Sequence, residues 1–184
     1  AIVSANASTT DAIIQFAIPT SDAGLIDVDA ALAGGDAAAD VFRIRLMTAL
    51  PAINNVSAKK ITIDATSQVG STGNTNPFGP EVQVDDGCAI DTGVELRTTS
   101  EIRGFAVSNF DFSFYVRGND IVVAGNYIGT DATGSTPAGN RYGVWLGACA
   151  VNNYIGTDSD GHFDESERNV ISGNSVEGVR IEGV

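Results

Sequence analysis

Apolar and polar residues alternate in short runs along most of the chain, with a period of two. Runs of this kind predict β-strands that bury one face. In the first half of the chain we expect strands at 12–18, 41–46, 60–64 and 81–85. Between them, the Ala/Asp/Gly-rich stretch 20–40 is interpreted as an insertion or loop that could hold a short helix over 27–33, and 66–80 as a loop.

From about residue 90 the chain repeats itself. Counted from Val94, equivalent positions recur after 20, 30 and 35 residues, at Phe114, Val144 and Val179, and the longer steps contain turn-rich loops. The first set of repeated segments is 93–97, 113–117, 143–147 and 178–182. The second set is 102–110, 121–128, 151–155 and 170–175. Self-similarity at this period indicates structural units that stack on one another.

The repeats favour a parallel β-helix, an all-β solenoid. No segment is long enough for a helical repeat, and the six Leu lack the spacing of a leucine-rich repeat. We expect capping material and entry strands over 1–80 and stacked coils over 81–184. Asn109, Asn126 and Asn174 are expected at corners, where side-chain amides can hydrogen-bond from coil to coil. An antiparallel β-sandwich is the alternative.

Several motifs resemble those of a known family. The runs 126–134 and 169–174 resemble the repeats of bacterial secreted right-handed parallel β-helix proteins, and the upstream runs 16–19, 49–53, 61–64 and 79–80 are similar to their entry region. The resemblance implies a right-handed coil and a secreted or cell-surface location. That family includes adhesins, surface proteins and carbohydrate enzymes, so the likeness does not choose a function. Ala65 departs from the family pattern, which usually has Gly there.

Composition narrows the range of partners. The chain has 184 residues, is 43% hydrophobic and carries a net charge of −13. Such a surface repels phosphate backbones and anionic lipid, so nucleic-acid binding is not expected. No apolar run has the length of a membrane span, so membrane insertion is not expected either. The chain begins with Ala, which we interpret as removal of a signal peptide or as a fragment.

Alternation within the repeated strands assigns their faces. Val94, Phe114, Val144 and Val179 point inward, so the next residues form one column outside the coil. The predicted binding column consists of Glu95, Tyr115, Trp145 and Arg180, with Arg97 and Arg117 beside it. Aromatic rings flanked by charges suit the stacking of sugar rings or a protein contact. An aromatic pair that only stabilises the sheet is the simpler alternative.

The acidic loop 158–167 is a second candidate site. Its closely spaced oxygen ligands are of the kind that calcium prefers, although the spacing is not that of an EF-hand. The candidate ligands are Asp158, Asp160, Asp164 and Glu167. The alternative is that these carboxylates are simply solvated at the surface. No other cofactor is expected.

Cys88 and Cys149 are the only cysteines. One disulfide between them is conceivable in a secreted chain, but the expected register puts them at opposite ends of neighbouring strands. Two buried small apolar residues are the alternative. His162 is the single histidine, so neither a His-based metal site nor a Ser-His-Asp triad is self-sufficient, and no catalytic residues are assigned.

These patterns favour a non-catalytic extracellular or cell-surface module for structure or adhesion. Because the sequence ends in or just after a strand, an open coil edge is expected to be covered by further coils or by a second subunit stacking head to tail. The alternative is a polysaccharide lyase or hydrolase, or a glycan-binding module, and polysaccharide is the expected ligand class in those cases.

Overall fold

The computed structural model describes residues 1–28, 40–87, 89–158, 161–162 and 164–183. Its short strands form three sheets. The first contains β1 (Ala12–Gln15), β4 (Ile61–Asp64), β7 (Ser100–Arg103), β10 (Ile121–Ala124) and β13 (Tyr154–Ile155). The second contains β2 (Leu25–Asp27), β3 (Asp40–Leu46), β5 (Val82–Asp86), β8 (Phe105–Ser108), β11 (Tyr127–Ile128) and β14 (Val170–Ile171). The third contains β6 (Thr92–Leu96), β9 (Phe112–Val116), β12 (Tyr142–Leu146) and β15 (Glu177–Ile181).

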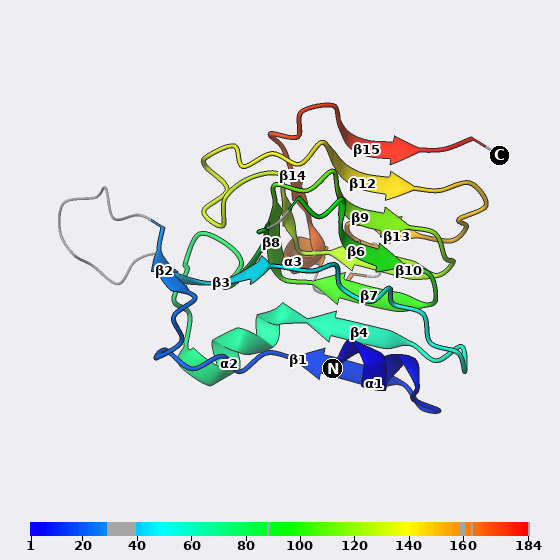
Figure 1. Cartoon of the computed structure of the whole chain (residues 1–184), viewed down its shortest axis with the longest axis horizontal. Coiled ribbons are helices and arrows are strands. Elements are labelled where there is room, and N and C mark those ends of the chain that lie inside the picture. The colour runs from blue at the N-terminus through cyan, green and yellow to red at the C-terminus, as the bar shows by residue number, and fades with distance from the viewer. Residues whose placement is uncertain (29–39, 88, 159–160, 163, 184) are drawn as a thin grey trace.

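The chain visits the three sheets in turn and so winds into a parallel β-helix, in which each strand pairs with its equivalent one coil away (Figure 1). Coil 1 is formed by β1, β3 and the isolated bridge residue Ile53, which pairs with Leu96 of β6. Coils 2, 3 and 4 are β4–β5–β6, β7–β8–β9 and β10–β11–β12. Coil 5 is β13–β14–β15, at the opposite end from α1 (Ile2–Asn6) and β1.

Parallel pairing decides between the two expected architectures. Every pair of described strands is parallel except β2 with β3, which run antiparallel beside coil 1. The register aligns Val94 with Phe114, then with Val144, and then with Val179. The predicted solenoid and its inward line of residues are therefore confirmed, and the sandwich alternative is wrong.

The interior of the solenoid is aliphatic and aromatic. Phe114, Leu96, Ile121 and Ile128 are fully buried, and inward residues of all three sheets form one continuous core. At the coil 5 end the same inward positions are open, with Val179 43% and Ile181 74% exposed. None of the described helices is long and apolar enough to cross a membrane.

Several local expectations need correction. The expected loop 66–80 begins with a 3-10 helix η1 (Ala65–Ser67) and the short helix α2 (Gln68–Thr72). Asp64 caps η1 by accepting a hydrogen bond from the Thr66 backbone nitrogen, a local contact that alternation does not reveal. The predicted strand 12–18 is shorter, because β1 ends at Gln15. Residues 29–33 of the expected helix 27–33 lie outside the described residues. Asp27 is the last residue of β2.

The second set of repeats covers two strands per coil. Residues 102–110 span the end of β7 and all of β8, and 121–128 span β10 and β11, whereas 151–155 and 170–175 hold β13 and β14 of the same coil and are therefore not equivalent to each other. Gly104 and Gly125, at φ of +79° and +65°, make the corner between β7 and β8 and between β10 and β11. Only glycine adopts this backbone freely, so the corner is sharp and each half joins a different sheet.

Asparagines do connect the coils, but not in one column. Asn126 is fully buried and its backbone nitrogen donates to Asn169 Oδ1 at 2.9 Å, one coil away. Asn174 is paired with Asn140 instead, whose Nδ2 donates to Asn174 Oδ1 at 3.1 Å. Asn109 adopts φ +68° and donates to Asp85. Hydrogen bonds from coil to coil through asparagine side chains are therefore confirmed, but the expectation that Asn109, Asn126 and Asn174 occupy equivalent corners is wrong.

Candidate functional site

The predicted binding column lies on the outer face of the third sheet. Glu95 of β6 pairs in register with Tyr115 of β9, Tyr115 with Trp145 of β12, and Trp145 with Arg180 of β15. The inward neighbours Val94 and Leu96 are buried, so alternation turns the column outward. The structure therefore brings together all four residues that the sequence placed in the column.

The column belongs to a larger group of aromatic rings. Phe112 at the start of β9 stacks on Tyr115, with ring centroids 5.8 Å apart, and on Tyr142 of β12, at 5.4 Å. Trp145 meets both Phe112 and Tyr142 edge to face at 4.9 Å. We call Phe112, Tyr115, Tyr142 and Trp145 the aromatic cluster. Edge-to-face and offset contacts at these separations are favourable, so the cluster ties β9 to β12.

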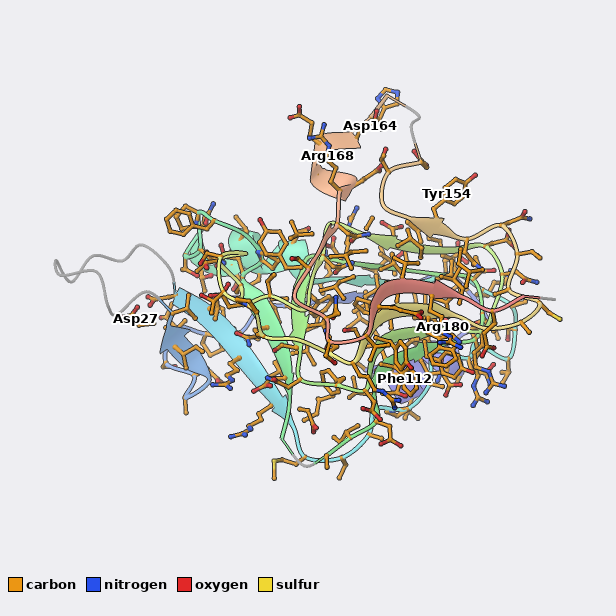
Figure 2. All side chains as sticks on the ribbon, turned by 90° about the horizontal axis from the view of Figure 1, so that it is seen from above. Asp27, Phe112, Tyr154, Asp164, Arg168 and Arg180 are labelled. Atoms are coloured by element: carbon orange, nitrogen blue, oxygen red, sulfur yellow. The ribbon has the colours of Figure 1, made fainter. Side chains whose placement is uncertain are left out.

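Three arginines lie over the rings of the aromatic cluster. The guanidinium carbon of Arg180 is 4.5 Å from the Trp145 ring centroid, that of Arg141 is 5.1 Å from Tyr142, and that of Arg117 is 5.4 Å from Tyr115. A cation within about 6 Å of a ring face is attracted by its quadrupole. Figure 2, which looks down on coil 5, shows Arg180 and Phe112 on the same side of the solenoid.

Glu95 forms ion pairs with two of the neighbouring arginines. Its carboxylate accepts bonds from Arg97 at 2.9 and 3.1 Å and from Arg117 at 3.3 Å. Partial burial alone would raise the pKa of Glu95, but the bonds from Arg97 and Arg117 outweigh it and hold the pKa below its usual value. Glu95 in turn raises the pKa of Arg97. The carboxylate is therefore ionised, and its charge orients two side chains beside the rings.

Sequence reasoning missed Phe112, Tyr142 and Arg141. Strict alternation from Val94 and Phe114 assigns Phe112 and Tyr142 to the inner face, yet both stack with outward rings. The intervening residue Ser113 is fully buried beside the fully buried Phe114, so alternation is interrupted at the start of β9. At that position a Cβ on Gly143 would lie 2.3 Å from the Gly178 carbonyl oxygen, which shows how closely successive coils approach. The sequence did hold a signal for these rings, because an aromatic residue stands three positions before Tyr115 and another three positions before Trp145.

The cluster is only partly open to solvent. Tyr142 is 7% exposed, and the indole nitrogen of Trp145 is covered without a hydrogen-bond partner in the structure described. Phe112, Tyr115 and Trp145 are half-buried, whereas Arg97 and Arg117 are exposed. A ligand would therefore meet the rings of Phe112 and Tyr115 and the surrounding guanidinium groups more readily than the indole nitrogen.

The candidate calcium ligands are brought together in part. Carboxylate oxygens of Asp158, Asp164 and Glu167 all lie within 4.8 Å of one another, while Asp160 lies outside the described residues. Asp164 and Glu167 belong to the short helix α3 (Asp164–Glu167), which stands out from the coil in Figure 2. Asp164 accepts a hydrogen bond from Thr157, and Glu167 accepts one from the Asp158 backbone nitrogen. These bonds hold the loop in its present shape with the carboxylates already engaged.

Cys149 differs from the expectation of a buried apolar residue. Cys149 is an exposed free thiol in a turn, with φ +72°, so that alternative is wrong for Cys149. Cys88 lies outside the described residues.

A groove on another side of the solenoid was not found from the sequence. Two adjoining hollows of about 420 and 380 Å³ share Thr66 and Ser166. The first lies between α3, α2 and the second sheet, and the second lies between α3 and the first sheet. The floor carries Arg103, which bridges Asp64 at 2.8 Å and Glu101 at 3.3 Å. Burial alone would raise the pKa of Asp64, but the Arg103 and Thr66 bonds lower it overall. Asp64 is therefore an ionised structural group rather than a proton donor.

Comparison with known proteins adds no relative: no family model, no curated protein and no solved structure matches this chain. The resemblance of its repeat motifs to secreted β-helix proteins therefore remains a prediction from the sequence.

Proposed function

We propose that this protein is a non-catalytic extracellular β-helix module that acts in adhesion or in building a surface structure. The observation that carries the proposal is the aligned outer column, in which Glu95, Tyr115, Trp145 and Arg180 occupy successive coils and the two aromatic members belong to the aromatic cluster. A rigid, repetitive lateral surface of rings and guanidinium groups matches an extended partner with a repeating structure. We infer that this partner is a polysaccharide.

The charged groups favour binding over catalysis. A carboxyl group that acts as a general acid needs a raised pKa. Burial would raise the pKa of Asp64 and Glu95, but hydrogen bonds from arginine outweigh it and lower both pKa values. Arg43 is likewise paired with Asp85, and Lys60 with Glu101. Ion pairs of this kind hold side chains in place at the surface, which suits a scaffold.

The open edge of coil 5 is part of the same proposal. Strand β15 leaves Val179 and Ile181 exposed, and main-chain groups at a strand edge can pair with another strand. We propose that a second copy covers this edge. Sedimentation at increasing concentration tests this proposal, and a chain that stays monomeric at all concentrations excludes it.

The proposal of polysaccharide binding is tested by affinity gel electrophoresis. Neutral and acidic polysaccharides (xylan, polygalacturonate and alginate) are cast separately into the gel, and the mobility of the folded chain is measured. We expect at least one of them to retard the protein, and Tyr115→Ala to weaken that retardation about tenfold, the value of one aromatic contact of roughly 1.4 kcal/mol. Each variant is first checked for an unchanged circular dichroism spectrum.

Tyr154→Ala is the matched control, because Tyr154 is 49% exposed and lies on β13 of the first sheet, away from Phe112 and Arg180 (Figure 2). Equal loss of retardation in Tyr115→Ala and Tyr154→Ala, or no retardation of the wild-type chain by any of these polysaccharides, would contradict the proposal.

The carbohydrate-active alternative rests on the groove beside α3. Glu101 and Glu167 both line it, together with Arg103. Release of reducing ends or of unsaturated products from the same polysaccharides would support this second function, and Glu101→Gln should then abolish it. Retardation without any product formation supports the non-catalytic module.

A further inference from the structure

The interior of the solenoid is not filled at the α1 end. A cavity of about 290 Å³ extends from coil 1 into coil 3. Its walls come from all three sheets, with Ile63 and Ile102 from the first, Val84 and Val107 from the second, and Val94 and Phe114 from the third. These six residues are buried inward positions of the coil, so the cavity is a gap in the core itself.

The lining is almost entirely hydrocarbon. Gln15 has the one polar side chain among the residues that line the cavity, and this residue is exposed to solvent. Ile14 and Leu50 of coil 1 also line the cavity but are only half-buried, as is Ile2 of α1, so these residues form its mouth. A space of this kind offers water almost no hydrogen-bond partners, and empty apolar cavities of about 150 Å³ stay dry and take up benzene.

The geometry points to a binding site for a small, uncharged apolar molecule inside the coil 1 end of the solenoid. The cavity is about twice the size of one that accommodates benzene, so it suits a two-ring hydrocarbon or a medium-length alkyl chain. A charged head group would find no partner among the inward side chains of the three sheets, so the interior favours uncharged ligands. The site shares no residue with the aromatic cluster, so this inference does not rest on the proposed polysaccharide binding.

The ligand test uses naphthalene and n-octane as separate probes, with the methyl resonances of Ile, Leu and Val followed by NMR. We expect saturable shifts concentrated on the methyl groups of Ile63, Val84 and Ile102. Val84→Phe places a ring in the cavity and should weaken binding at least tenfold while the circular dichroism spectrum stays unchanged. Binding by only one probe identifies the shape that the cavity prefers, ring or chain, and supports the site.

Stability provides a readout that does not depend on the ligand. Val84→Leu adds a methylene to the empty space and should leave Tm unchanged or raise it. Val144→Leu adds the same group inside coil 4, where Val144 is fully buried and does not line the cavity, and should lower Tm.

No shift with either probe, or shifts that Val84→Phe leaves unchanged, would overturn the site. A Tm for Val84→Leu that falls as far as that of Val144→Leu would show that the space is already filled, and this result also overturns it.

Discussion

Arg180 lies over the indole ring of Trp145, with its guanidinium carbon 4.5 Å from the ring centroid, although the two residues are 35 positions apart in the chain. They are register partners on β12 and β15, so the contact reports the pairing of coil 4 with coil 5. Arg180 also bonds Glu177 at 3.5 Å, which holds its side chain across the ring. The outer face of the third sheet thus helps to attach the last described coil.

The Arg180–Trp145 contact should be measurable in a double-mutant cycle. We expect Arg180→Ala and Trp145→Ala to show a coupling of about 0.5–1 kcal/mol in the free energy of unfolding, because the pair is half-exposed. Urea denaturation of the four proteins measures it. The control cycle pairs Arg180→Ala with Tyr154→Ala, for which we expect additivity; equal coupling in both cycles would show that the cation–π contact is not its source.

Asn126 should be among the most sensitive polar residues in the chain. Its side chain accepts from the Phe105 nitrogen at 3.0 Å and donates to the carbonyls of Ile102 and Ala124 at 3.1 and 2.9 Å. Asn126→Ala leaves these buried backbone groups without partners, at a cost of about 1–3 kcal/mol for each group left unsatisfied. Thermal and urea unfolding should show a loss of at least roughly 3 kcal/mol.

Asn119→Ala is the control for that change. Asn119 also accepts a backbone hydrogen bond, from Val151 at 2.9 Å, but it is exposed, so water can replace the lost group. We expect a loss below about 1 kcal/mol. If the two variants lose equal stability, burial is not what makes Asn126 important.

Two glycines should respond in opposite ways to alanine. Gly104 has φ +79°, and a Cβ there would lie 2.7 Å from the Thr66 backbone nitrogen, so Gly104→Ala should destabilise the fold by more than about 1 kcal/mol. Gly70 lies inside α2 with open space around its Cβ position, so Gly70→Ala should stabilise by about 0.5–1 kcal/mol. Urea denaturation measures both, and a stabilising Gly104→Ala would mean that the corner between β7 and β8 is not as tight as described.

Acid should weaken the fold through Asp64 and Glu95. Despite their burial, hydrogen bonds from arginine lower both pKa values in the folded chain below the ordinary 3.8 and 4.5. The stabilising contribution is therefore complete above those ordinary values and is lost as the pH falls below them toward the folded-state pKa values. Asp64→Asn should reduce the difference in unfolding free energy between pH 7 and pH 3. A variant that keeps the full difference would show that the Asp64–Arg103 pair does not contribute to it.

The sequence by itself determined the coil and much of its register. Alternation shows which residues face inward, and the repeat places Val94, Phe114, Val144 and Val179 in one line, because equivalent strands of stacked coils must pair to bury that face. The outer column Glu95–Tyr115–Trp145–Arg180 follows directly from the same alternation.

Only the tertiary structure decided what surrounds that column and what lies inside the coil. Phe112 and Tyr142 join the aromatic cluster although alternation from Phe114 and Val144 assigns them to the inner face, and Asn126 meets Asn169 although the two are 43 positions apart in the chain. The groove beside α3 and the cavity under α1 depend on how segments distant in the chain fit together. Local patterning specifies which face a side chain takes, whereas a cavity depends on the combined volumes of residues from several coils.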